Sequence, residues 1–329
     1  MATRQALRSD PLLAARASFA LAMIAGLAAC DFTEPVPPPA PEPPKAAPAA
    51  PPAPRQAPAP KLDRDAQIYF KRLQDGLLVQ GLLRQDGGGP DTPYTARELA
   101  RNFIQIALYD EYRTEADTLV PEATESVLRR WSQPVRIGIE YGAAVPPAQR
   151  AEDSAFIARF AIRLSRLTKH PVSVAPAAAN FHVLILDETS RQAIAPRLRN
   201  LAPGISETVV REIVTLPRTT LCLVVAFPNG PDRATYSKAI AVVRAEHPEL
   251  IRKGCIQEEL AQGMGLANDS PQARPSIFND DEEFARLTTH DEQLLKMLYD
   301  PRMRPGMTVN EAEPVARVIA RELAGEGES

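Results

Sequence analysis

The sequence is poor in the residues that build metal centres and redox centres. Its 329 residues include four histidines and three cysteines, and the histidines form no compact ligand motif. Positive charge is not in excess either, because 38 Lys and Arg stand against 41 Asp and Glu and leave a formal charge of −3. Such a balance leaves no basic surface suited to nucleic acid, so we expect no nucleic-acid partner.

The N-terminal apolar run is too short to cross a membrane. Arg4, Arg8 and Arg16 precede an uncharged apolar stretch from Ala17 to Ala29. A spanning helix needs about 20 such residues, whereas a basic start followed by a shorter apolar run is typical of a secretory signal. Residues 1–29 are therefore predicted to be a signal peptide.

The end of this stretch, Leu27-Ala28-Ala29-Cys30, resembles the lipobox of bacterial lipoproteins. The resemblance implies that Cys30 carries acyl chains such as palmitate, becomes the mature N-terminus and anchors the protein to a membrane, facing the periplasm. Asp31 resembles an inner-membrane retention signal of enterobacterial lipoproteins. The alternative is ordinary cleavage after Ala28 or Ala29, which leaves Cys30 as an odd thiol.

A proline-rich tether is predicted to follow, over residues 30–60. Between Pro35 and Pro60, 13 of 26 residues are proline and most of the others are alanine. This composition cannot bury a core and favours an extended polyproline II chain. Binding of a proline-recognition module is the alternative role. The globular part is expected to begin near Lys61.

Hydrophobic residues make up 44% of the chain, enough for a core. We expect an N-terminal helical region over 61–125 and a second domain over 126–329. Periodicity predicts strands and helices in an order that favours an α+β fold over a doubly wound parallel sheet. The expected helices cover 63–84, 95–109, 147–170, a segment that starts near Pro248 and carries Glu258 and Gln262, 288–299 and a last helix capped by Thr308 or Asn310. The expected strands cover 135–139, 180–187, 220–227 and 239–243.

Cys222 and Cys255 remain once Cys30 is assigned to lipidation. In an oxidising compartment two leftover cysteines are candidates for a disulfide. The alternative is two separate buried thiols, because Cys222 lies in an apolar strand and cysteine is readily buried.

The stretch from Cys255 to Ser270 carries the main functional pattern. Glu258 and Gln262 are four residues apart and share one helix face, Glu259 lies beside them, and Gly265 and Asn268 follow. This is the spacing of the zinc-protease motif H-E-x-x-H-x-x-G-x-x-H with every histidine replaced.

This stretch resembles the metzincin branch of the zincin metallopeptidases, most closely the matrixins. Ile277-Phe278 stands where an Ile-Met turn is usual, and Leu287 to Tyr299 is similar to the helix that follows it. The resemblance implies a zincin-like mixed sheet with a backing helix and a signature helix. It makes Glu259 the general base, Glu258, Gln262 and Asn268 the metal-ligand positions, and Gly265, Phe278 and Asp291 structural residues of the site.

The whole chain also resembles an uncharacterised family of proteobacterial lipoproteins, the domain of unknown function 2927. The phrases CIQEELAQGMGLAND, PSIFNDDEEFARLT and KMLYDPRMRPGM carry this resemblance. That family has no established activity, so the resemblance implies a fold and a location but no reaction.

The replaced histidines decide the expected chemistry. A catalytic zinc usually has three protein ligands, commonly imidazoles, whereas neutral amide oxygens suit harder cations such as calcium. We therefore expect no metal, no cofactor and a non-catalytic envelope protein that binds a polypeptide or an envelope polymer along residues 220–227. One alternative is a divergent hydrolase that uses Glu259 as general base. Others are a relocated zinc site using His290 with Glu258 and a purely structural spacer.

Overall fold

The computed structural model describes residues 59–115, 118–229, 233–279 and 281–325, which belong to one compact unit beginning at Ala57. The predicted signal peptide, Cys30, Asp31 and all but the last two residues of the predicted tether lie outside the described residues. Within the described ranges, no helix has both the length and the apolar character needed to cross a membrane.

A mixed sheet forms the centre of the fold. Its strands run in the order β3-β8-β6-β4-β5, all parallel, and β7 pairs antiparallel with β8 at the edge. The bounds are β3 Arg130–Trp131, β4 Val135–Tyr141, β5 Val172–Val174, β6 Phe181–Leu186, β7 Cys222–Asn229 and β8 Thr235–Arg244. The chain returns antiparallel from β7 to β8, and β6 lies between β8 and β4.

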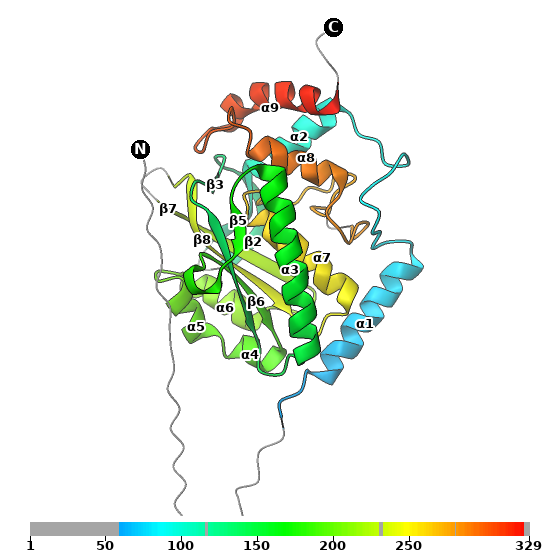
Figure 1. Cartoon of the computed structure of the whole chain (residues 1–329), viewed down its shortest axis with the longest axis vertical. Helices are drawn as coiled ribbons and strands as arrows, with labels where there is room; N and C mark the ends of the chain where they lie inside the picture. Colours follow the sequence, from blue (N-terminus) through cyan, green and yellow to red (C-terminus); the bar gives the residue numbers. More distant parts are fainter. Residues whose placement is uncertain (1–58, 116–117, 230–232, 280, 326–329) are drawn as a thin grey trace, which may run out of the picture. The chain divides into compact units, whose positions relative to one another are not determined.

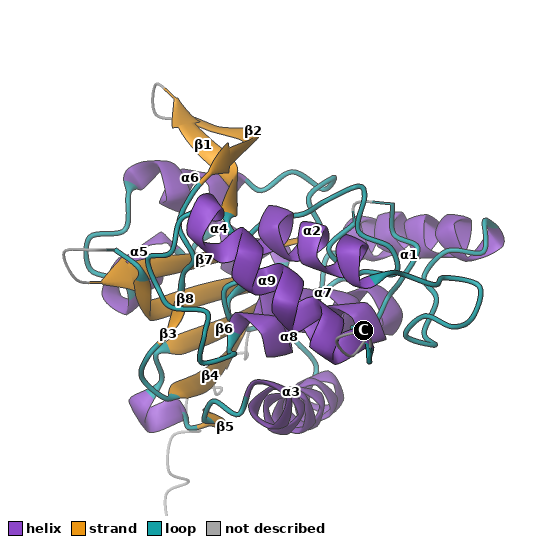
Figure 2. Ribbon diagram, turned by 90° about the horizontal axis from the view of Figure 1, so that it is seen from above, coloured by secondary structure: helices purple, strands orange, loops and turns teal. Residues whose placement is uncertain are grey.

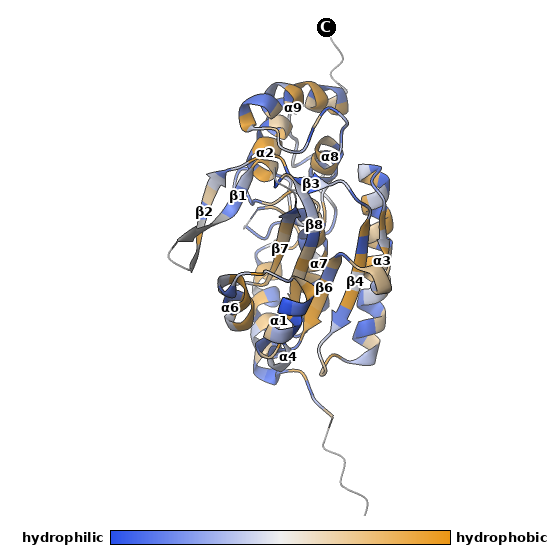
Figure 3. Ribbon diagram, turned by 90° about the vertical axis from the view of Figure 1, so that its left-hand side faces the viewer, coloured by the Kyte–Doolittle hydropathy of each residue, from blue (hydrophilic) through white to orange (hydrophobic). Residues whose placement is uncertain are grey.

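Alternating side chains of the central strands divide the interior into two cores. Val183 and Ile185 of β6 enter the larger cluster, whereas Leu184 and Leu186 enter the smaller one on the other face. Successive strand residues point to opposite faces, so a strand that is apolar throughout needs cover on both sides. Every residue of β6 is buried, and the hydrophobic colour of the central strands in Figure 3 shows this pattern.

Helices cover both faces of the sheet (Figure 2). The larger core contains residues from α3 (Pro147–Thr168), α7 (Glu249–Gln262) and α8 (Thr289–Leu298). The smaller core contains residues from α5 (Ala195–Leu201) and α6 (Glu207–Thr215), which follow the short helix α4 (Glu188–Gln192). The architecture is therefore mixed α+β, as the sequence predicts, with helices on either side of a largely parallel sheet.

The remaining helices are α1 (Arg64–Val79), α2 (Ala96–Ala107) and α9 (Val309–Ala324). Helix α2 begins with a capping box, in which Thr95 and Glu98 bond to each other's backbone, and α9 begins with another at Thr308. The box at Thr95 lies at the predicted start of α2, and of the two caps predicted for the last helix, Thr308 and Asn310, the structure has Thr308. Figure 1 shows α2, α8 and α9 gathered at one end of the sheet.

Two predictions about the N-terminal region are wrong. Helix α1 ends at Val79 and not near residue 84, because Gly81 follows with φ +77°, which a helix cannot contain. The region 61–125 is also not wholly helical, since β1 (Tyr109–Glu115) and β2 (Thr118–Glu125) form an antiparallel hairpin. Figure 3 shows this hairpin beyond the outer edge of β7. A short 3₁₀ turn, Pro176–Ala178, precedes β6.

Candidate functional site

A cleft of about 750 Å³ lies between the edge strand β7 and the helix α7. Five successive β7 residues, 222–226, line it, so the strand's edge and not one of its faces borders the cleft. The hairpin contributes Asp110 and Glu111, and Val209 of α6 lies at the border. Polar side chains from other elements also line the cleft, namely Arg129, Arg233, Tyr236, Glu258, Glu259, Gln262, Asp269 and Glu282.

Helix α7 presents three polar residues to this cleft. Glu258 and Gln262 are one turn apart, and Glu259 is three residues before Gln262, so the three side chains form one continuous patch of helix surface. The opposite side of the helix, including Ile256 and Leu260, is buried in the larger core. Adjacent glutamates diverge by about 100° on a helix, yet both Glu258 and Glu259 line the same cleft here.

The turn after α7 is fixed by close packing. Trp131 Nε1 donates to the Gly263 carbonyl at 2.8 Å, and Tyr299 Oη donates to the Met264 carbonyl at 3.0 Å. Gly265 has φ +129°, and a Cβ there would stand 2.3 Å from the carbonyl oxygen of Arg129. Only glycine fits this backbone conformation and this approach. The predicted structural role of Gly265 thus has a specific physical basis.

After the turn the chain passes the cleft again, but the residue that lines it is Asp269 and not the predicted Asn268. Gln262 Nε2 donates to Asp269 Oδ1 at 2.9 Å, and Asp269 lines the cleft. Asn268 is buried elsewhere, and its Nδ2 donates to the Gln105 carbonyl at 2.8 Å. The expectation that Glu258, Gln262 and Asn268 form one polar group is therefore wrong, because Asn268 points into the packing against α2.

The two glutamates of α7 stand in an environment that disfavours their charge. Burial raises the pKa of Glu258 well above its usual value, and the nearby carboxylates of Asp269 and Glu259 raise this pKa further. Burial likewise raises the pKa of Glu259, together with the charges of Glu111 and Asp269. Burial and like charges act in the same direction, so both groups hold their protons to higher pH than an exposed glutamate.

Glu259 is the most enclosed of these carboxyl groups. Its residue is 3% exposed, and its Oε2 atom has no hydrogen-bond partner among the described residues. A buried polar atom without a partner is uncommon and costs free energy. Arg129, a basic residue of the lining, pairs with Asp110 of the hairpin at 2.6 Å. Burial raises the pKa of Tyr236 to about 12, so it stays a neutral phenol beside the cleft.

A disulfide between Cys222 and Cys255 joins the wall of the cleft to its floor. Cys222 belongs to β7 and Cys255 to α7, and the prediction of this bond is confirmed. Glu258 Oε2 lies 3.8 Å from the Cys222 sulfur. Among the described residues, one group of at least three His, Cys, Asp or Glu ligand atoms lies within 4.8 Å, namely Cys222, Cys255 and Glu258. Both sulfurs of this group are bonded to each other in the disulfide, so neither is a thiolate ligand.

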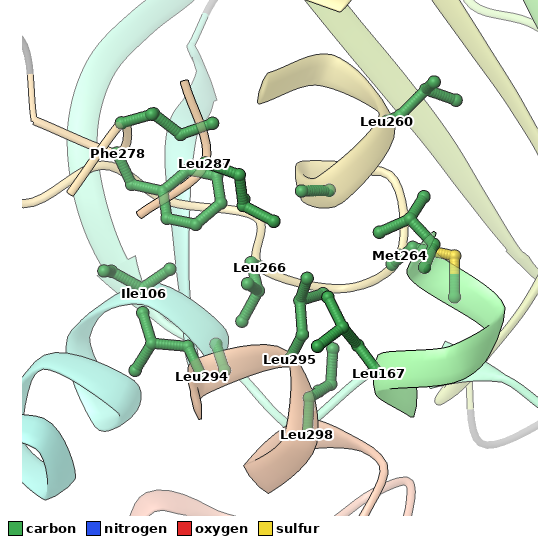
Figure 4. Packing of buried hydrophobic residues seen from close by; sticks show 14 of the residues in the cluster. Ile106, Leu167, Leu260, Met264, Leu266, Phe278, Leu287, Leu294, Leu295 and Leu298 are labelled. Carbon is green, nitrogen blue, oxygen red and sulfur yellow. The ribbon is translucent and has the colours of Figure 1, made fainter. Parts of the chain in front are cut away.

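The predicted structural residues Phe278 and Asp291 lie behind the turn. Phe278 is buried in the larger core near Leu266 and Leu287, as Figure 4 shows. Asp291 is fully buried and accepts hydrogen bonds from the backbone N–H of Ile277 at 3.1 Å and from Ser276 Oγ at 2.6 Å. Asp291 therefore holds the loop that carries Phe278, and neither side chain lines the cleft.

The histidine alternative does not match the geometry. His290 is fully buried, with its Nε2 atom 3.1 Å from Asn102 Nδ2, and it does not line the cleft with Glu258. The zinc positions implied by the peptidase resemblance also do not fit that metal. Asn268 is directed away, and Gln262 has its amide engaged with Asp269. The donor set of a zinc site is not assembled here.

Sequence reasoning missed the acidic residues that surround the α7 glutamates. Asp269 comes directly after Asn268, and a one-residue shift in the turn decides which of the two faces the cleft. Glu111 and Glu282 come from the hairpin and from the loop before α8, both distant in sequence. The β1 sequence, YDEYRTE, has no regular alternation of apolar and polar residues, and nothing in the sequence placed β1 beside α7.

Comparison with known proteins gives a family without a known activity. No curated protein and no solved structure matches the chain. The family model described as "Protein of unknown function (DUF2927)" matches residues 96–318, which include the sheet, α7 and every acidic residue of the cleft. The chain belongs to this DUF2927 family.

Proposed function

We propose that this protein is a lipid-anchored protein of the cell envelope that binds an extended polypeptide segment along the outer edge of β7. The observation that carries the proposal is the cleft whose wall is the edge of β7 and whose floor is α7. The binding is non-catalytic in this proposal, and the polypeptide adds a strand to the sheet.

The edge of β7 supports this mode of binding. Within the described residues β7 pairs with β8 alone, so one side of the strand has no strand partner. Such an edge presents a row of backbone N–H and C=O groups that an extended chain can pair with. The cleft also leaves room beside this edge, because residues 222–226 border it continuously.

The fold supports descent from a peptidase-like binding site. The zincin resemblance implies a mixed sheet, a backing helix and a signature helix. The sheet, α3 and the C-terminal half of α7 correspond to these elements. The ligand positions of that resemblance are not assembled, as described above. Among the described residues that line the cleft the zinc donor set is not assembled, which favours peptide binding over metal-dependent hydrolysis.

The membrane anchor is the second part of the proposal. It rests on the lipobox-like residues before Cys30 and on the proline-rich stretch that separates Cys30 from the folded unit. Several acyl chains together give stable attachment. Cells expressing the full chain and fed labelled palmitate are expected to label it, and Cys30→Ser is expected to abolish the label and the membrane fractionation. Retention of both by Cys30→Ser would remove the anchor from the account.

The binding function is tested with a library of acetylated, amidated heptapeptides. We expect affinity selection on the full chain to enrich peptides that bind saturably with 1:1 stoichiometry. Successive N–H groups of a strand point to opposite sides, so one of the two alternate sets of peptide nitrogens faces β7. Methylation of that set keeps the side chains but prevents pairing, and we expect it to abolish binding, whereas methylation of the other set is tolerated. If no heptapeptide binds saturably, or if neither methylated set weakens binding, the proposed function is wrong.

A divergent hydrolase is the second candidate, and one observation favours it. Both Glu258 and Glu259 line the cleft with raised pKa values, and groups of this kind serve as general acids and bases. In this case a bound peptide or envelope polymer is cleaved, and Glu259→Gln abolishes cleavage but keeps binding. Selected peptides that remain intact after prolonged incubation with the wild-type chain would exclude them as substrates and favour the binding function.

A further inference from the structure

The cleft has a strong excess of acidic groups over basic ones. Among the described residues its lining includes six carboxyl side chains and two arginines. One of the arginines, Arg129, is paired with Asp110 at 2.6 Å. The carboxyl groups come from β1, α7, the turn after α7 and the loop before α8, and they are Asp110, Glu111, Glu258, Glu259, Asp269 and Glu282.

An acidic lining alone does not define a ligand, but Glu259 adds an independent observation. Its side chain is 97% buried and borders the cleft, and its Oε2 atom lacks a partner among the described residues. A buried acceptor of this kind is satisfied when a ligand supplies a donor. A cationic donor gives the stronger bond, since charge-assisted hydrogen bonds are about twice as strong as neutral ones.

We infer that the polypeptide bound along β7 carries a lysine or arginine whose side chain crosses the cleft to the Glu259 carboxylate, an inference that rests on the binding function proposed above. Residues 222–226 hold the backbone, and the α7 glutamates select the side chain. Alternate side chains of an added strand point to the same side. One basic residue at the centre of a bound heptapeptide is therefore enough to reach the floor.

The ionisation of the cleft gives the inference a measurable consequence. Burial and the neighbouring carboxylates raise the pKa of free Glu259, and a cation beside it acts in the opposite direction. The basic side chain is therefore expected to favour the ionised carboxylate, so affinity rises with pH. The titratable and charged groups that face Glu258 and Glu259 across the cleft are Asp110 and Glu111 of β1, Arg129, Arg233, Tyr236 of β8, Asp269 and Glu282.

The test compares a selected heptapeptide bearing a central lysine with the same peptide bearing norleucine at that position. An arginine and citrulline pair forms the second arm and distinguishes the two cations. For the full wild-type chain we expect the cationic member to bind roughly tenfold or more tightly, the scale of a charge-assisted bond. Glu259→Gln is expected to remove the preference.

Glu249→Gln is the matched control. Glu249 lies in the first turn of the same helix, pairs with Lys253 and does not line the cleft. We expect this variant to keep the full preference for the cationic peptide. Circular dichroism and thermal unfolding establish that both variants are folded.

The outcomes separate this inference from the function on which it rests. Equal binding of the lysine and norleucine peptides, with binding still lost on backbone methylation, would overturn the inference and keep the proposed function. A preference that survives Glu259→Gln would also overturn it, because the cation would then be recognised elsewhere. If Glu259→Gln is unfolded, the comparison of the lysine and norleucine peptides on the wild-type chain decides, since equal affinity would contradict the inference. If no peptide binds saturably, both the proposed function and this inference are wrong.

Discussion

Cys222 and Cys255 are bonded to each other, with their Cα atoms 5.8 Å apart, and the bond joins the edge strand β7 to the helix α7. The wall and the floor of the cleft are therefore covalently connected at one point. Glu258 lies one turn after Cys255 on the same helix, within 3.8 Å of the Cys222 sulfur. The distance between the β7 backbone and the α7 carboxyl groups thus depends on this connection.

Removal of the disulfide is expected to cost stability. The bond closes a loop with a sequence separation of 33 residues, for which chain-entropy arguments give roughly 3 to 4 kcal/mol. We expect urea unfolding of the double variant Cys222→Ser with Cys255→Ser to show a free energy of unfolding lower by that amount. We also expect the variant to bind selected heptapeptides more weakly. Wild-type chain treated with a reductant is the control and should behave like the variant. Unchanged unfolding of both would contradict the prediction.

Replacement of Gly265 is expected to damage the turn that places Asp269. An alanine there combines an unfavourable φ of +129° with a Cβ 2.3 Å from a backbone oxygen, which cannot move as a flexible side chain can. We expect Gly265→Ala to destabilise the fold by roughly 2 to 5 kcal/mol in urea unfolding.

Gly204→Ala is the matched control for Gly265. Gly204 also has a positive φ, +91°, but a Cβ there meets nothing within 4 Å. Its cost is therefore that of backbone conformation alone, about 1 to 2 kcal/mol. Equal destabilisation by both variants would show that the close approach to Arg129 has no energetic weight.

A buried ion pair secures α7 against α3. Arg252 Nε lies 3.0 Å from both carboxylate oxygens of Asp153, which is fully buried. Asp153→Ala leaves the guanidinium buried without its partner, and we expect a loss of about 3 to 5 kcal/mol in the free energy of unfolding. The exposed pair of Lys71 and Asp75 is the control, because Asp75→Ala should cost less than about 1 kcal/mol. Similar costs for the two variants would contradict this account.

The α7 glutamates should make stability depend on pH in a defined direction. The folded-state pKa of Glu259 lies well above the unfolded value of 4.5, so the folded chain binds more protons. Its stabilising contribution is complete below the unfolded pKa and is lost as pH rises through the folded pKa.

Glu259→Gln removes this titration. We therefore expect the free energy of unfolding of the variant to increase relative to that of the wild-type chain as the pH rises above 4.5, measured by urea unfolding. Glu249→Gln, which removes a carboxyl group whose pKa is lowered by Lys253, should give no such gain. If the free energies of unfolding of the wild-type chain and of Glu259→Gln change with pH in parallel, the prediction is wrong.

The sequence predicted the elements whose pattern is local. Short stretches of sequence were enough to predict these elements. Examples are the helix caps at Thr95 and at Thr308 or Asn310, the alternation in β4 and the apolar run of β6. The disulfide was also predictable, since only two cysteines remained after Cys30 was assigned. These features depend on residue chemistry and spacing and not on distant contacts.

The cleft depends on contacts that spacing alone does not determine. The helical pattern placed Glu258, Glu259 and Gln262 on α7, but the backbone conformation at Gly265 decides that Asp269 returns to the cleft while Asn268 turns towards Gln105. The hairpin that brings Glu111 to the cleft was missed, because a helical reading was extended over residues 61–125. Its position beside β7 follows from tertiary packing.

Strand addition at β7 is tested most directly by amide hydrogen exchange on the full chain with and without a saturating, library-selected heptapeptide. The account predicts that the amides of residues 222–226 exchange more slowly in the complex, and that the same peptide methylated on the set of nitrogens that faces β7 does not protect them. A bound peptide that leaves the exchange of residues 222–226 unchanged would contradict it.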